Sequence, residues 1–284
     1  MNVTFYTNAS DFLARTRDAL EMDEAANNLM LGIAQRLASG NAPPAWSTPC
    51  LTTVDDDAGR LALAAVMTPP AKLVLYGEGD VWQPATEPLT QHLLDNGWYV
   101  PGVLGPSEVA HAFAETWQAL TRYPYRAGMR QRVHALRQVV QRGNAAGRLR
   151  AATSDDQGLL AAWFAAFHEE ALHETPDADA ARDNAERRIA AGDMFVWEND
   201  GQVVSMTARS RPTRHGIAVN AVYTPPEQRG RGYATAAVAT LSQQLLDEGY
   251  AFCCLFTDLS NPTSNRIYQR IGYRPVCDFN EYIF

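Results

Sequence analysis

Apolar residues in the second half of the chain recur with helical spacing in some segments and with extended spacing in others. Residues 149–153 predict a short strand, and the apolar positions from Leu159 to Ala171 lie three or four residues apart, which predicts an amphipathic helix. A second helix is predicted at about 180–191 and would end at Gly192. Two extended segments then flank Asn199-Asp200-Gly201, which is typical of a hairpin turn because such turns need positive φ.

The alternation continues around a glycine-rich segment near the middle of this half. An extended segment at 217–223 precedes it, and a helix with an apolar stripe is predicted at 232–247. The continuous apolar run at 251–257 is typical of a strand buried on both faces. Asn261-Pro262 then predicts a helix that ends before Gly272, since Asn caps helices and proline favours their first position. The remaining residues predict one or two final strands.

The first half shows the same kinds of element in nearly the same order. Helices are predicted at about 10–21, 24–38, 87–95 and 107–123, and strands near 51–54, 60–67 and 73–76. This order indicates an internal structural duplication. A polar, glycine-bearing seam near 142–150 predicts the boundary between domains at 1–147 and 148–284. The predicted fold class is α/β, with a mixed α+β sheet in each of two domains.

Length and composition agree with two ordinary globular domains. The chain has 284 residues, 46% hydrophobic and 20% charged. Its net charge of −8 argues against a nucleic-acid partner, and no apolar run reaches the ~20 residues that span a membrane. The start of the chain lacks the pattern of a signal peptide. The four cysteines form no C-x-x-C pair, so we expect reduced thiols, no metal site and a cytoplasmic location.

One segment has the composition of a phosphate-binding loop: Arg229-Gly230-Arg231-Gly232-Tyr233-Ala234. It joins a predicted strand to a predicted helix, whose N-terminus offers unpaired N–H groups to an anion. The two glycines let the backbone approach a pyrophosphate, and the two arginines add charged donors. A Walker A loop is excluded because Lys72 is the only lysine, and a Rossmann loop is disfavoured because an antiparallel meander precedes the segment.

Two motifs, in this order, resemble the GNAT superfamily of N-acetyltransferases. The segment 229–234 matches the superfamily's [RQ]-x-x-G-x-[GA] loop at every defined position, and the helix opened by Asn261 carries Tyr268 and ends in Gly272-Tyr273. The resemblance, which covers about 149–284, implies two tandem GNAT-like acyl-CoA N-acyltransferase domains with a degenerate first copy. The nearest counterpart of the loop in that copy is Val103-Leu104-Gly105-Pro106-Ser107, which has one glycine and no arginine. We therefore expect no acyl-CoA there.

The resemblance further implies that acetyl-CoA is the co-substrate and that a primary amine attacks it directly in a ternary complex, without a metal. Tyr268 would be the catalytic general acid that protonates the departing thiolate. The residues implied in cofactor binding are Ala221, Val222 and Tyr223 for the pantetheine arm, Arg229, Gly230, Arg231, Gly232, Tyr233 and Ala234 for the pyrophosphate, and Asn261 in the second motif.

The general base stays open, because the predicted strand 217–223 has no carboxylate and Asn220 cannot accept a proton near neutral pH. The candidates are Glu169, Glu170, Asp258, His168, His173, His215 and a water chain. The missing carboxylate favours a second function class, an acyl-CoA-binding regulatory module without chemistry, and a longer acyl-CoA is a third possibility. The acceptor, among metabolite, antibiotic-like and peptide amines, and the oligomeric state stay open too.

An arginine-rich segment lies between the two halves and contains no acidic residue. Its arginines either form a basic face for an anionic partner or for the 3′-phosphate of CoA, or belong to a final strand and linker that pair with acidic groups. The alternation of Arg130, Arg132 and His134 favours the outer face of a strand. The arginines of the segment are Arg122, Arg126, Arg130, Arg132, Arg137, Arg142, Arg148 and Arg150.

Overall fold

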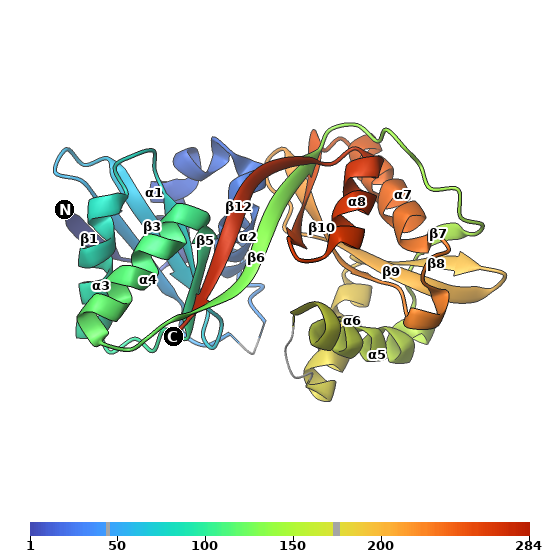
Figure 1. Ribbon diagram of the computed structural model, residues 1–284, viewed down its shortest axis with the longest axis horizontal. Coiled ribbons are helices and arrows are strands. Elements are labelled where there is room, and N and C mark those ends of the chain that lie inside the picture. The colour runs from blue at the N-terminus through green and yellow to red at the C-terminus, as the bar shows by residue number, and fades with distance from the viewer. Residues whose placement is uncertain (44–45, 173–176) are drawn as a thin grey trace. The chain divides into compact units, whose positions relative to one another are not determined.

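The computed structural model describes residues 1–43, 46–172 and 177–284 (Figure 1). The chain divides into two compact units. Unit 1 consists of Met1–Val133 together with Val276–Phe284, and unit 2 consists of His134–Pro275.

Unit 1 is a mixed sheet with helices on both faces. Its elements are β1 (Asn2–Phe5), α1 (Ala9–Glu21), α2 (Glu24–Ala38), β2 (Cys50–Asp55), β3 (Leu61–Met67), β4 (Leu73–Gly77), α3 (Thr86–Asp95), β5 (Gly102–Pro106), α4 (Ser107–Thr121), β6 (Arg126–Leu136) and β12 (Arg274–Ile283). The strand order is β1-β2-β3-β4-β5-β12-β6, and β4 and β5 are parallel.

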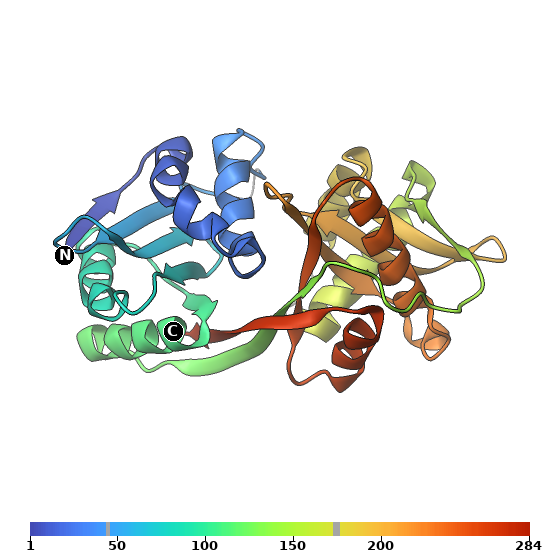
Figure 2. The ribbon, with the colours of Figure 1, turned by 90° about the horizontal axis from the view of Figure 1, so that it is seen from above.

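The core of unit 1 follows from the alternation of side chains along its strands. Leu63 and Ala65 in β3 pack with α3 and α4, whereas Ala64 and Val66 pack with α1 and α2. Figure 2 shows these two helix pairs on opposite sides of the strands. Burial on both faces explains why β3 is apolar throughout.

Unit 2 repeats this plan. Its elements are β7 (Arg148–Ala151), α5 (Gln157–Phe167), a π-helical turn (His168–Leu172), α6 (Ala178–Ala190), β8 (Met194–Asn199), β9 (Gln202–Ser210), β10 (Gly216–Tyr223), α7 (Tyr233–Asp247), β11 (Phe252–Asp258) and α8 (Pro262–Ile271). The strand order is β7-β8-β9-β10-β11-β6, with β6 contributing its last residues. In Figure 1, α5 and α6 lie on one face of these strands and α7 and α8 on the other.

The predicted fold class is confirmed: both units are mixed α/β, and the elements follow one another in the same order in each. Most predicted elements lie within two or three residues of the observed ones. Two strands, β1 and β5, were not predicted, and neither was the π-helical turn. His134 in β6 is only 1% exposed, so its assignment to the outer face of a strand was wrong.

The compact units differ from the predicted domains 1–147 and 148–284 at both ends of the second domain. Residues 276–284 pack in unit 1, where β12 pairs with β5 from Phe279↔Pro106 to Ile283↔Gly102. The ring of Phe284 stacks on Trp117 at 5.1 Å. Hydrophobic periodicity predicts that a segment is a strand but does not specify its neighbour, so this placement is not visible in the sequence.

The segment predicted to be a linker between domains packs on unit 2. The Val140 amide donates to the Ile271 carbonyl at 2.8 Å, and Trp197 Nε1 donates to the Ala146 carbonyl at 2.9 Å. A Cβ on Gly143 would lie 2.7 Å from Ala236 Cα in the first turn of α7, so only glycine fits at this approach. Residues 140–147 therefore form a covering segment of unit 2.

Candidate functional site

A β-bulge interrupts β10 just before its end. Asn220 pairs with Ala208 of β9 and Tyr223 pairs with Met206, so Ala221 and Val222 both lie opposite a single residue of β9. Ala221 has φ of +50°, a left-handed conformation that is uncommon for a residue with a side chain. The bulge removes backbone groups from the ladder and re-aims them, at the residues predicted to pair with a pantetheine arm.

β10 and β11 are tightly packed at their start and diverge towards their ends. Their parallel register covers Gly216↔Phe252 to Ala218↔Cys254, although β10 continues to Tyr223 and β11 to Asp258. A Cβ on Gly216 would lie 2.1 Å from the Phe252 ring, so this glycine permits the close start. The part of β10 that follows Ala218 is not in this register with β11, and it contains the bulge.

The glycine-rich loop ends in an uncapped helix. Gly230 and Gly232 have φ of +78° and +82°, and Gly232 is the N-cap residue of α7. No side chain of the described residues caps this helix, whose first intrahelical bond runs from the Ala236 amide to the Gly232 carbonyl. The amides of the first turn, those of Tyr233 and Ala234 among them, therefore remain available to an anion.

The side chain of Arg229 is held beside the end of β10. Its Nε donates to the Thr224 carbonyl at 2.9 Å, and its Nη2 donates to Glu170 Oε2 at 2.5 Å. The Tyr223 hydroxyl donates to Glu170 Oε1 at 3.0 Å, and the guanidinium carbon lies 5.7 Å from the centre of the Tyr223 ring. We call Glu170, Tyr223 and Arg229 the Glu170 cluster. Arg231 is exposed.

The cluster shifts the pKa values of its members in opposite directions. Burial raises the pKa of the Glu170 carboxyl, but the hydrogen bonds from Arg229 and Tyr223 outweigh it, and the net pKa lies below its usual value. Burial and the neighbouring carboxylate raise the pKa of the Tyr223 phenol. Glu170 is therefore ionised at neutral pH and is a weaker base than an ordinary glutamate.

Of the other base candidates, Asp258 has a partner in its own turn and His173 lies outside the described residues. Asp258 accepts hydrogen bonds from the amide and hydroxyl of Ser260 in its own turn, at 2.8 and 2.6 Å. Asn220 accepts one from Arg188 of α6 at 3.2 Å. β10 itself carries no carboxylate.

Tyr268 and Asn261 occupy different parts of α8. Tyr268 is 9% exposed and lies in one apolar cluster with Val219 of β10, edge-on to the Tyr273 ring at 5.9 Å. Burial raises the pKa of its phenol to about 12. Asn261 caps the helix, since its side-chain oxygen accepts from the Ser264 amide at 3.0 Å. The polar atoms of Asn261 are thus engaged in the fold, whereas Tyr268 packs against the strand that carries the bulge.

Tyr233, another predicted cofactor-binding residue, directs its ring away from the loop. The ring is 7% exposed and packs with Trp197 and Val204, and its hydroxyl lies 3.4 Å from the Asn199 side-chain amide. Only the backbone amide of Tyr233 can face an anion at the start of α7.

The topological counterpart of the loop in unit 1 is not the predicted segment 103–107. That segment belongs to β5 and the first residue of α4. Because β4 and β5 pair in parallel as β10 and β11 do, the counterpart is the connection between β4 and α3, residues 78–85. It contains Glu78 and Asp80 but no arginine. The position between two parallel strands, and not the glycine content, identifies the counterpart.

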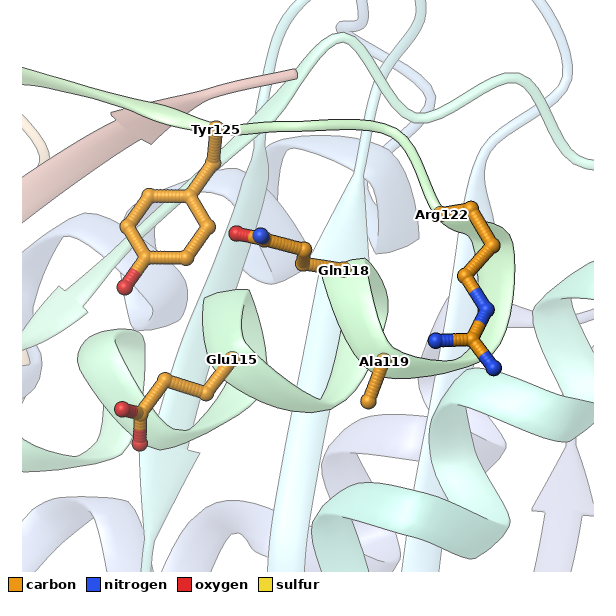
Figure 3. A pocket seen from close by; sticks show the side chains of 5 residues that line it. All are labelled: Glu115, Gln118, Ala119, Arg122 and Tyr125. Atoms are coloured by element: carbon orange, nitrogen blue, oxygen red, sulfur yellow. The ribbon is translucent and has the colours of Figure 1, made fainter.

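Two surface hollows lie elsewhere. One, of about 470 Å³, is lined in unit 1 by the C-terminal half of α4 and by Tyr125, as Figure 3 shows. The other, of about 490 Å³, is lined in unit 2 mainly by small residues of α5 and α6. Neither contains a residue of the loop or the bulge, so neither is the predicted cofactor site.

Within residues 1–43, 46–172 and 177–284, no three His, Cys, Asp or Glu side chains are grouped so that they could hold a metal ion. None of the helices in this part of the chain is both long and apolar enough to cross a membrane.

Comparison with known proteins gives one family match. Residues 158–273 match the model of the acetyltransferase (GNAT) family. No curated protein matches the chain.

Solved structures match the chain over nearly its full length. They include a GNAT-family acetyltransferase from Colwellia psychrerythraea (12% identity, 100% of both chains, TM-score 0.61) and a GCN5-related N-acetyltransferase from Sphaerobacter thermophilus (15%, 99% of this chain and 94% of the other, TM-score 0.63). A Drosophila protein matches with 10% identity, over 99% of this chain and 98% of the other, at a TM-score of 0.68. At these identities the likeness shows the fold alone.

Proposed function

We propose that this chain, whose residues 158–273 match the model of the acetyltransferase (GNAT) family, transfers the acetyl group of acetyl-CoA to a primary amine. The observation that carries the proposal is the sequence of features at the end of β10. The bulge at Ala221 and Val222 lies where β10 and β11 diverge, and one short turn separates it from the uncapped, glycine-rich start of α7. A ligand with an extended polar arm and a pyrophosphate would meet both.

The proposed binding roles follow from available backbone groups. Ala221, Val222 and Tyr223 offer the edge of β10 to the pantetheine arm, and an amide of the bulge polarises the thioester carbonyl as an oxyanion hole does. The amides from Gly230 to Ala234 receive the pyrophosphate. Arg229 and Arg231 add positive charge at the same end of the helix.

Tyr268 is the proposed general acid. Its pKa of about 12 means that the phenol keeps its proton at neutral pH, which a donor to the departing thiolate requires. The amine attacks the carbonyl directly, the carbon–sulfur bond breaks, and the proton from Tyr268 goes to sulfur. The lowered pKa of Glu170 and the turn contacts of Asp258 disfavour both as the acceptor of the amine's proton, which leaves the other named candidates and a water chain.

Isothermal titration with acetyl-CoA tests the proposal. We expect one site per chain, and release of free CoA when primary amines are added. A chain that does not bind acetyl-CoA would contradict the proposal, and two sites per chain would contradict the expectation that unit 1 is a degenerate copy.

The absence of a carboxylate from β10 supports a second candidate, an acyl-CoA-binding regulatory module. Binding without thiol release across amines of metabolite, antibiotic and peptide type would favour it. Comparing acetyl-CoA with longer thioesters in the same assay decides the acyl chain length. A cytoplasmic location stays our proposal, and the four free cysteines support it.

A further inference from the structure

The Glu170 cluster joins three segments that are far apart in the sequence. Glu170 lies in the π-helical turn after α5, Tyr223 ends β10, and Arg229 opens the glycine-rich loop. Both oxygens of the carboxylate accept a hydrogen bond, one from Tyr223 and one from Arg229. The Arg229 Nε donates to the Thr224 carbonyl, so the guanidinium is fixed on two sides.

Arg229 keeps binding capacity in this arrangement. A guanidinium has five N–H groups, and the bonds to Thr224 and Glu170 use only two of them. The fork is thereby oriented while its remaining donors can still receive a phosphate oxygen. A freely rotating arginine would lose side-chain entropy when it binds, and a held one has already lost most of it.

We propose that Glu170 is a positioning residue, which fixes Arg229 and the end of β10 so that the loop is prepared for the pyrophosphate of the acyl-CoA. This inference rests on the proposed function. It assigns Glu170 to cofactor affinity and not to proton transfer, although it was one of the candidate bases.

Neutralising Glu170 should change the affinity for acetyl-CoA in opposite directions, depending on whether the carboxylate acts through its charge or by positioning Arg229. Removing a negative charge next to a phosphate site strengthens the attraction of the anionic cofactor. Removing the partner of Arg229 releases the guanidinium and weakens binding. The sign of the change in affinity therefore separates the two effects.

The experiment measures the Kd of acetyl-CoA for Glu170→Gln by isothermal titration, with Glu169→Gln as the control. Glu169 is the exposed neighbour in the same turn, so the control removes the same charge. The Arg229–Glu170 pair is partly exposed, and such pairs stabilise only modestly, so we expect Kd to rise about 3- to 10-fold for Glu170→Gln. Glu169→Gln should bind unchanged or slightly more tightly.

Two further measurements distinguish a positioning role of Glu170 from a role as general base. In steady-state assays the KM for acetyl-CoA should rise while kcat stays within about threefold, whereas loss of a general base would lower kcat by about 10²-fold or more. In a double-mutant cycle with Arg229→Lys, the second substitution should add little to the first.

Equal or tighter binding by Glu170→Gln would overturn the inference while leaving the proposed function intact. A large fall in kcat at unchanged KM would overturn it in favour of the base. If the wild-type chain bound no acetyl-CoA, both would fail. Thermal unfolding of each variant checks that the fold is kept.

Discussion

The two units share one plan but differ at the connection that follows the fourth strand of each. In unit 2 this connection contains the glycine-rich loop, and Gly232, with positive φ, is the N-cap residue of α7; among the described residues, neither α7 nor α3 has a side-chain cap. In unit 1 the connection is residues 78–85, and a 3-10 turn, Gln83–Ala85, leads directly into α3. The amide of Ala85 donates to the Trp82 carbonyl at 2.9 Å, so part of the helix start is already satisfied.

The parallel register of β4 and β5 in unit 1 covers only Leu73↔Val103 and Val74↔Leu104, so it also ends before the strands do, as that of β10 and β11 does. A Cβ on Gly105 of β5 would lie 3.2 Å from the Leu75 carbonyl of β4, and a Cβ on Gly77 would lie 2.8 Å from the Trp82 side chain. Trp82 thus covers the end of β4, where unit 2 has open backbone. The difference teaches that the fold alone does not supply the site; the bulge in β10 and the glycine-rich loop with its arginines, which the corresponding part of unit 1 lacks, do. We propose that unit 1 binds no acyl-CoA for this reason.

The largest effect should come from Tyr268→Phe, which makes α8 resemble α4 at one position. Tyr268 is the seventh residue of α8, and the seventh residue of α4 is Phe113, which is fully buried. Removing the hydroxyl removes the proposed acid, so kcat should fall by about 10²–10⁴-fold, as measured by the rate of free thiol release. The Kd of acetyl-CoA should stay near its wild-type value. Unchanged turnover would show that Tyr268 serves only in packing.

The second largest expected effect is on acetyl-CoA binding, and it compares one glycine in the β10–α7 connection with one in the β4–α3 connection. Gly232→Leu should weaken acetyl-CoA binding by about 100-fold or more, because the strained start of α7 would misplace several amides that donate to a charged group. Gly79→Leu is the matched control, since Gly79 also has positive φ and open space around it. Titration calorimetry compares the two. Similar losses in both variants would mean that the site is not confined to unit 2.

The smallest expected effect concerns the residues that stabilise the start of the first long helix in each unit. In unit 2, Asp156 accepts hydrogen bonds from Arg150 and from the Thr153 amide, and the Arg150 bond is the largest cause that holds the pKa of Asp156 below its usual value. In unit 1, the uncharged Asn8 caps α1 by accepting from the Ser10 amide at 2.8 Å. Only the first arrangement depends on pH.

Asp156→Asn should therefore lower the free energy of unfolding by about 1–3 kcal/mol at pH 7. A lowered carboxyl pKa stabilises the fold above its unfolded value of 3.8, and this contribution is lost as the pH falls through the still lower folded value. The gap between variant and wild type in denaturant unfolding should thus close below pH 3.8. For Asn8→Ala the deficit of about 1 kcal/mol should be the same at each pH. A pH-independent deficit for Asp156→Asn would show that its charge is not the stabilising element.

The sequence predicted the loop and the helices around it because their signals are local. Gly232 and Asn261 specify helix starts within a few residues of themselves, and both helices begin where these residues indicate. The bulge was not predicted, because alanine at position 221 gives no sign of a positive φ. It is imposed by the register with β9.

Interactions between distant segments were also invisible. The Glu170–Arg229 pair joins residues 59 positions apart, and neither residue type indicates its partner. β5 was missed because Gly102–Pro106 contains residues that disfavour strands, and its position comes from packing between β4 and β12. Contacts and strand positions that are set by a segment distant in the sequence could therefore not be predicted.

The place of β12 in unit 1 has a consequence for how the protein is made. Residues 1–133 leave the ribosome before the rest of unit 1, because the strand between β5 and β6 is supplied by residues 276–284, which follow the whole of unit 2. At about 5–20 residues per second, unit 1 waits on the order of ten seconds with two open strand edges, while residues 134–275 are still being added. A stop directly after residue 275 would therefore spare the residues of unit 2 and leave the earlier-made unit incomplete.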